Sequence, residues 1–143
     1  MPPVHPLVVL DTSVVSLLMR RDGKTKFYQD SIAGKRAVIS FQTLEEAWFG
    51  AIKANWGEAR RNKLSLHLDQ FDVVWPTPEM VRICAHLRTE REQAGRRLGI
   101  ADAWVAATAI MLRCPLVSHD GDFEDIPNLQ LVRAPARQSL SAG

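Results

Sequence analysis

The sequence predicts an α/β fold with three layers, in which helices cover both faces of a mostly parallel, five-stranded sheet. Short apolar runs alternate along the chain with longer segments of helical periodicity, which is typical of parallel strands joined by crossover helices. Several of these runs lack polar alternation, as expected of strands that are buried on both faces. No repeat, low-complexity block or linker divides the chain. We therefore expect a single domain over residues 1–143, with its core at about 7–132.

The predicted elements follow this alternation from one end of the chain to the other. The segments expected to form strands are 7–10, 37–40, 72–75, 116–118 and 129–132. The segments expected to form helices are 14–19, 25–32, 42–54, 58–71, 79–93 and 100–112. Polar loops at 20–24 and 94–99, a proline-rich lead-in at 1–6 and a mobile tail at 134–143 complete the chain.

Local signals set several of these boundaries. Thr12 and Ser13 offer hydroxyl caps for the first helix, and Thr77 followed by Pro78 marks the start of a later one. In the helix at 42–54, residues Leu44, Ala47, Trp48, Ala51 and Ile52 form the predicted apolar face. The helix at 100–112 has an apolar or small residue at nearly every position, so we expect it to be buried.

The composition is that of an ordinary globular protein, with 46% hydrophobic and 24% charged residues. No run approaches the ~18 apolar residues that a membrane-spanning helix needs, and residues 1–6 do not resemble a signal peptide. Cys84 and Cys114 form no CxxC pair and are expected to be two reduced thiols. These features predict a cytoplasmic protein.

The charge balance is compatible with an anionic partner. The formal net charge is only +2. If four of the 16 acids lie together in one site, the other 12 face 18 Lys and Arg, which leaves the remaining surface about six charges positive. Such an excess suits nucleic acid.

Acidic residues occur at comparable places along the predicted fold. Asp11 directly follows the first strand, and Asp120 and Asp122 follow the fourth. Glu46 lies one turn into the helix after the second strand, and Asp102 opens the apolar helix at 100–112. Because the carboxyl ends of parallel strands share one edge of a sheet, these acids can meet in one cleft.

Clustered carboxylates raise one another's pKa, and a divalent cation removes that conflict. Oxygen ligands without a convergent His or Cys favour Mg²⁺ or Mn²⁺ over zinc. Such a site can polarise a phosphodiester and generate the attacking hydroxide. The residues alone therefore predict an acidic metal site suited to phosphoryl chemistry.

Each acid also has a purely structural alternative. Asp11 and the acids of the turn at 119–125 can serve as turn or capping residues. Asp102 can cap its helix or interact with the helix dipole, although the apolar residues after it favour a buried helix entrance. Glu45 and Glu46 are adjacent and cannot share a face, and Glu46 is preferred because Glu45 lies toward the polar side. In that alternative both glutamates are solvated.

Four motifs carry a resemblance to a known family. They are VLDTS at 9–13, TLEE at 43–46 with Gly50 following, DAWVAATA at 102–109, and LVSHDGDF at 116–123, which continues into IPNL at 126–129. In this order and spacing, they resemble the PIN-domain ribonucleases, in particular the VapC-type toxins of bacterial toxin–antitoxin modules. The similarity covers about residues 7–132. Two departures, Ala47 in place of a common leucine and the extra acid Glu45, remove no proposed ligand.

The resemblance implies a PIN-like α/β/α sandwich whose acidic pocket binds Mg²⁺ or Mn²⁺ and cleaves RNA. By motif, the catalytic acids are Asp11, Glu46, Asp102 and Asp120, the metal ligands are Asp11, Asp102, Asp120 and Asp122, and the supporting hydroxyls belong to Thr12, Ser13 and Ser118. Asp120 and Asp122 are both candidates for the fourth site acid, with Asp120 favoured. Glu46 would bind metal or orient the attacking water.

The resemblance also implies partners. A VapC-like protein pairs with a small antitoxin whose tail blocks the acidic groove, and it commonly forms a homodimer. The candidates for contacts with the RNA backbone are Lys24, Lys26, Arg60, Arg61, Arg96 and Arg97.

Three other functions are alternatives to the nuclease. A non-catalytic PIN-like protein that binds RNA or a partner is disfavoured because no acid of the motifs is missing. A haloacid dehalogenase-like phosphohydrolase would need a second Asp where this chain has Ser13. A receiver domain would need a lysine that closes a later strand, and the sequence offers none in a suitable place.

Overall fold

The computed structural model describes residues 5–20 and 25–135. Three sequence predictions therefore fall wholly or partly outside the described residues. These are the first part of the lead-in at 1–4, most of the loop at 21–24 with the RNA-binding candidate Lys24, and the tail at 136–143.

The five strands form one parallel sheet, as the sequence predicted, and their order in the sheet is β3-β2-β1-β4-β5. They are β1 (Leu7–Leu10), β2 (Arg36–Ser40), β3 (Asp72–Val74), β4 (Leu116–Val117) and β5 (Leu131–Val132). The middle strand is β1, in which Leu7 pairs with Arg36 of β2 and Val9 pairs with Leu116 of β4. Burial on both faces explains why its sequence is apolar without alternation.

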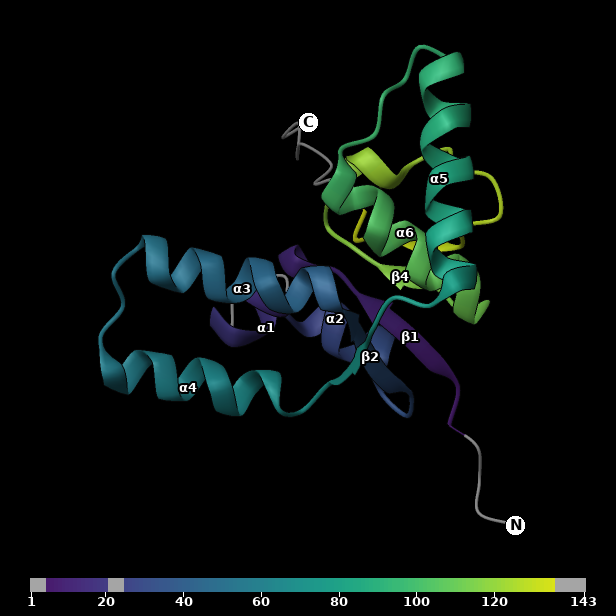
Figure 1. Ribbon diagram of the computed structural model, residues 1–143. Coiled ribbons are helices and arrows are strands. Elements are labelled where there is room, and N and C mark those ends of the chain that lie inside the picture. The colour runs from purple at the N-terminus through teal and green to yellow at the C-terminus, as the bar shows by residue number, and fades with distance from the viewer. Residues whose placement is uncertain (1–4, 21–24, 136–143) are drawn as a thin grey trace, which may run out of the picture.

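Six helices pack on the two faces of this sheet (Figure 1). They are α1 (Thr12–Arg20), α2 (Thr25–Ile32), α3 (Phe41–Lys53), α4 (Glu58–Leu68), α5 (Pro78–Gln93) and α6 (Ile100–Leu112). Val9 of β1 belongs to the core formed with α5 and α6, whereas Val8 and Leu10 belong to the core formed with α1 to α4. The period of two along the strand therefore separates two hydrophobic layers.

The helix α6 lies at the centre of its layer, as its apolar sequence predicted. Six of its residues, Ala103, Val105, Ala106, Ala107, Thr108 and Ala109, are buried. Its small side chains allow close packing against both α5 and β1. The first turn of α6 is consequently held in a fixed position at the edge of the sheet.

The start of α1 differs from the prediction. The helix begins at Thr12, and Thr12 and Ser13 lie inside it rather than capping it. Oδ1 of Asp11 accepts a hydrogen bond from the backbone N–H of Val14 over 3.1 Å, so Asp11 is the capping residue. A carboxylate is a strong acceptor and is favoured at the positive end of the helix dipole. The α5 helix begins as predicted, with Thr77 Oγ1 accepting from the N–H of Met80.

Four further expectations need correction at or near element ends. The α4 helix ends at Leu68 rather than at residue 71, because a turn closed by the Phe71 N–H on the Leu68 carbonyl leads into β3. Ile52, expected on the apolar face of its helix, is 60% exposed. The helices α3 and α4 extend beyond the sheet as a hairpin (Figure 1), so among the described residues no element covers Ile52. Trp75 lies past β3 and is 61% exposed. The strands β4 and β5 are shorter than predicted, with two residues each.

Two predicted properties of composition agree with the structure. Cys84 and Cys114 are free thiols. Among the helices of residues 5–20 and 25–135, none combines the length and apolar character needed to cross a bilayer.

Candidate active site

Asp11 stands at the carboxyl end of β1, and its carboxylate is almost completely buried, with 5% of the residue exposed. Oδ1 accepts hydrogen bonds from Ser13 Oγ at 2.6 Å and from the Val14 N–H at 3.1 Å, and Oδ2 accepts one from Ser118 Oγ at 2.5 Å. Burial raises the pKa of Asp11, the three hydrogen bonds lower it, and the charge of Asp120 raises it further. The net direction of the pKa is upward.

Ser118 connects Asp11 to the turn after β4. Besides donating to Asp11, its hydroxyl accepts a hydrogen bond from the Asp120 N–H over 2.9 Å. Oδ1 of Asp120 in turn accepts from the Asp122 N–H over 2.9 Å and caps the short 3₁₀ helix Gly121–Phe123. Since β1 and β4 are parallel neighbours, this network fixes acids from two distant motifs at one sheet edge.

Asp102 joins this edge from the first turn of α6. One carboxylate oxygen each of Asp102, Asp120 and Asp122 lies within 4.8 Å of the other two. The N-cap of α6 is Gly99, so no side chain caps this helix. The pKa of Asp102 is raised to about 6, chiefly by burial, then by the charges of Asp120 and Asp122, and less by those of Glu46 and Asp11. The acids of this cluster therefore repel one another when all of them are ionised.

Glu46 projects toward the same region from α3. Its Oε2 accepts a hydrogen bond from Thr12 Oγ1 at 3.0 Å, and its Oε1 accepts one from Gln42 Nε2 at 3.4 Å. Neighbouring Glu45 is exposed. The structure thus places Glu46, and not Glu45, beside the end of β1.

The donor set fits a hard divalent cation. Within the described part of the chain, none of the four salt bridges reaches Asp11, Glu46, Asp102, Asp120 or Asp122, so their negative charge lacks a paired cationic side chain. All the offered ligand atoms are carboxylate oxygens, which Mg²⁺ and Mn²⁺ prefer. On Asp11, Oδ1 already accepts two hydrogen bonds, whereas Oδ2 accepts one and keeps a second lone pair.

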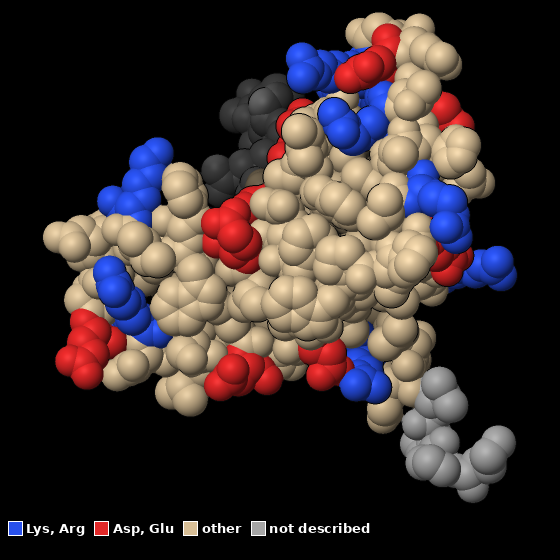
Figure 2. Space-filling model, in the orientation of Figure 1, with Lys and Arg blue, Asp and Glu red and all other residues tan. Residues whose placement is uncertain are grey.

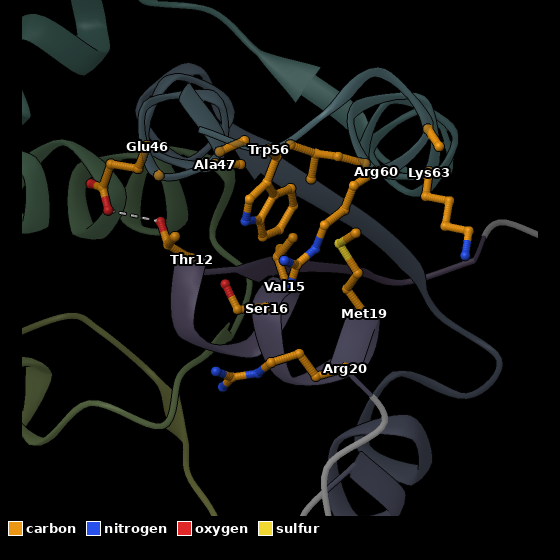
Figure 3. Close-up of a pocket in the computed structure, with 14 residues that line it drawn as sticks. Thr12, Val15, Ser16, Met19, Arg20, Glu46, Ala47, Trp56, Arg60 and Lys63 are labelled. Carbon is orange, nitrogen blue, oxygen red and sulfur yellow. Dashed lines mark hydrogen bonds between the residues drawn. The ribbon is translucent and has the colours of Figure 1, made fainter. Parts of the chain in front are cut away.

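Two cavities adjoin the acids. The larger has a volume of about 680 Å³ and lies between α1, α3 and α4, with Thr12 and Glu46 at one end. Figure 3 shows its lining, in which the indole of Trp56 and the side chains of Val15 and Met19 face one another. The smaller has a volume of about 230 Å³ and lies beside Asp102 and Asp122.

The predicted RNA-binding cations are spread over several elements. Figure 2 shows Lys and Arg on the α3–α4 hairpin and at the end of α5 rather than in one continuous patch. Arg60 stacks on Trp56 and lines the larger cavity, while Arg96 and Arg97 line the smaller one. Lys26 is exposed and pairs with Asp30. Arg61 is half-buried and borders neither cavity.

Sequence reasoning missed Arg91, which is buried in α5 and lines the smaller cavity. The signal was available in the helical spacing. The buried stripe of α5 consists of Met80, Cys84, Leu87 and Arg91, and a charged residue at such a position is unusual.

The two hydrogen bonds of the Ser118 hydroxyl lead to a direct prediction about the site. Ser118→Ala removes a donor to Asp11 and the acceptor of the Asp120 N–H, so it should lower the free energy of unfolding by about 1–3 kcal/mol. Thermal and urea denaturation would measure the loss. Ser65→Ala in α4 is the control, because that hydroxyl makes no hydrogen bond within the described residues, and its effect should stay within about 0.5 kcal/mol. Equal losses in the two variants would contradict a bridging role for Ser118.

The class of protein follows from this geometry. An α/β/α fold with a parallel sheet gathers carboxylates from β1, α3, α6 and the turn after β4 at one edge. The sequence model of the PIN domain family matches residues 8–129. The chain therefore belongs to the PIN domain family.

Named relatives agree with this placement. The chain is 27% identical over 110 residues to Ribonuclease VapC4 of Mycobacterium tuberculosis, covering 76% of this chain and 85% of the relative. It is 28% identical over 131 residues to Ribonuclease VapC1 of Haemophilus influenzae, covering 87% of this chain and 95% of the relative. These similarities confirm the resemblance to VapC-type proteins that the motifs carried.

Solved structures share the fold. VapBC2 from Rickettsia felis, bound to a DNA fragment from its promoter, superposes with a TM-score of 0.81 at 25% identity, covering 90% of this chain and 99% of that one. VapBC-1 from nontypeable Haemophilus influenzae superposes with a TM-score of 0.77 at 25% identity, covering 89% and 97%. The predicted PIN-like architecture is thereby confirmed.

Proposed function

We propose that this PIN-domain protein is a metal-dependent endoribonuclease, the toxin of a VapBC-type toxin–antitoxin pair. The observation that carries the proposal is the close approach of Asp102, Asp120 and Asp122 without a paired cationic side chain among the described residues. Its similarity to proteins named VapC ribonucleases supports RNA as the substrate.

The residues that would hold Mg²⁺ or Mn²⁺ are Asp11, Asp102, Asp120 and Asp122. When bound, the cation would supply Lewis acidity toward the phosphodiester and compensate the charge of the acids. Asp11 would be presented without reorganisation, since Ser13, Ser118 and the Val14 N–H already fix its orientation.

Glu46 is the proposed residue that orients the attacking water. Its carboxylate is held by Thr12 and Gln42, so it is positioned to accept a proton from that water. In-line attack of the water oxygen on phosphorus breaks the bond to the 3′ oxygen. The products would be a 3′-hydroxyl and a 5′-phosphate, as in the related family members.

The adjacent glutamates provide a matched test of this proposal. Glu46→Gln should lower kcat for cleavage of a labelled RNA by about 10²–10⁴-fold, because the general base is lost. Glu45→Gln removes the same charge from an exposed position and should leave kcat within about twofold. The assay would use Mg²⁺ or Mn²⁺, with an EDTA reaction as blank and mass spectrometry of the product ends.

Absence of cleavage by the purified wild-type protein in either metal would contradict the proposed function. Retention of RNA without turnover would support the alternative, a non-catalytic PIN-like binding protein. Equal activity of Glu46→Gln and wild type would remove the role given to Glu46 or reveal a contaminating nuclease.

An antitoxin is the proposed protein partner. Solved structures of similar chains are described as VapBC complexes, and the apolar cavity between α1, α3 and α4 ends at Thr12 and Glu46 (Figure 3). Apolar side chains of a partner seated there would lie directly beside the acids. The homodimer and the cytoplasmic location stay predictions.

A further inference from the structure

Arg91 is an unusual residue for its place in the fold. It lies in the last turn of α5, it is 8% exposed, and it follows Met80, Cys84 and Leu87 along the buried stripe of the helix. Its Nε is buried and has no hydrogen-bond partner in the described part of the chain. None of the salt bridges among those residues involves its guanidinium. A buried N–H donor without a partner is unfavourable, so an apolar residue of similar size would stabilise this position better.

The surroundings of Arg91 indicate a function for its positive charge. Arg91, Arg96 and Arg97 line the cavity of about 230 Å³ together with Asp102 and Asp122 of the acidic cluster. Arg96 already pairs with Asp125 at 3.3 Å. Arg91 and Asp102 border the same space but form no ion pair within 4.0 Å, which leaves the guanidinium facing a polar cavity beside the acids.

We propose that Arg91 binds a phosphate group of the RNA and positions it beside Asp102 and Asp122, an inference that rests on the proposed function. A guanidinium offers a planar fork of N–H donors that matches two phosphate oxygens, and such bonds strengthen when the donor is desolvated. The carboxylates alone would repel an anion in this cavity. A divalent cation held by these acids would compensate their charge, so binding of the cation would favour binding of the phosphate by Arg91.

This role also accounts for the burial of Arg91. Packing in α5 holds the side chain in place before substrate arrives, so little conformational freedom is lost on binding. The cost appears as lowered stability of the folded chain, which is the usual trade-off at a functional site. A purely structural arginine would show the opposite pattern, since its loss would destabilise the protein.

The test compares Arg91→Met with Arg91→Lys and with the control Arg82→Met. Arg82 is exposed and lies nine residues earlier in α5, on the opposite side of the helix. Arg91→Met should raise the melting temperature and weaken calorimetric binding of a 5′-phosphorylated RNA dinucleotide in Mn²⁺ by about 10- to 100-fold. Arg91→Lys keeps the positive charge but lacks the planar fork of N–H donors, so its affinity for the dinucleotide should fall between those of wild type and Arg91→Met. Arg82→Met should change neither quantity.

The outcomes separate this inference from the nuclease proposal. If wild type cleaves RNA and Arg91→Met matches Arg82→Met in binding and in KM, the phosphate site is wrong and the nuclease stands. If the dinucleotide binds through Arg91 but no RNA is cleaved, the site stands and the nuclease falls. A lower melting temperature of Arg91→Met with unchanged affinity would make Arg91 structural. If Arg91→Met does not fold, the test depends on Arg91→Lys. Reduced affinity of a natively stable Arg91→Lys for the dinucleotide would support the phosphate site, and unchanged affinity would overturn it.

Discussion

Asp102→Asn is expected to abolish RNA cleavage and, at the same time, to stabilise the metal-free protein. Loss of this carboxylate removes the acid that lies between α6 and the acidic turn, so cleavage should fall by about a thousandfold or more. The pKa of Asp102 is raised to about 6 by burial and by four neighbouring acids, so its charge opposes folding at neutral pH. Replacing it with a neutral isostere should add on the order of 2 kcal/mol to the free energy of unfolding at pH 7.5.

The control for this prediction is Asp69→Asn. Asp69 is exposed at the end of α4, away from the acidic edge, and its replacement by Asn changes the net charge by the same amount as Asp102→Asn. Its cleavage rate and stability should both match those of wild type. A loss of activity in Asp102→Asn accompanied by a loss of stability would indicate a folding defect, and would contradict the electrostatic account of the cluster.

The pH dependence of stability is the second large effect. The pKa of Asp102 lies near 6 in the folded protein and at its ordinary value of 3.8 in the unfolded chain, so the folded state binds this proton more tightly. Stability from this group is therefore fully present below about pH 4 and is lost as pH rises through about 6, by on the order of 2 kcal/mol. Asp11, whose pKa is also raised, acts in the same direction.

Urea denaturation in EDTA between pH 4 and pH 8 would measure this effect. The difference in unfolding free energy between Asp102→Asn and wild type isolates the single group from other titrating residues. It should be near zero at about pH 4, grow through pH 5 to 6 and level off above about pH 7. A difference that stays constant over this range would show that Asp102 does not titrate with a raised pKa.

The parallel sheet and its helices could be predicted because hydrophobic periodicity records which faces are buried. The β1 run is apolar at every position since both faces are covered, and the small residues of α6 reflect its central packing. Periodicity does not record which residue accepts the first free N–H of a helix. For that reason Thr12 and Ser13 were expected to cap the helix, with Asp11 as a cap only in the structural alternative, whereas the Thr12 hydroxyl donates to Glu46 and the Ser13 hydroxyl donates to Asp11.

The candidate site could be predicted as a set of acids, but not as a network. Strand ends place Asp11 and Asp120 at one edge in any parallel sheet, so topology is sufficient to bring them together. The bridge through Ser118 depends on side-chain rotamers, which spacing does not specify. Arg91 illustrates the same limit, because spacing shows its place on an apolar stripe, whereas only the three-dimensional arrangement of the described residues shows that its buried Nε lacks a hydrogen-bond partner.

The most direct test is a Mn²⁺ titration of metal-free protein followed by electron paramagnetic resonance at pH 7.5. The account predicts saturable binding by wild type and by Asp69→Asn, and binding at least about a hundredfold weaker by Asp102→Asn. If wild type does not bind Mn²⁺, or if all three proteins bind it equally, the claim that these acids form one cation site is contradicted.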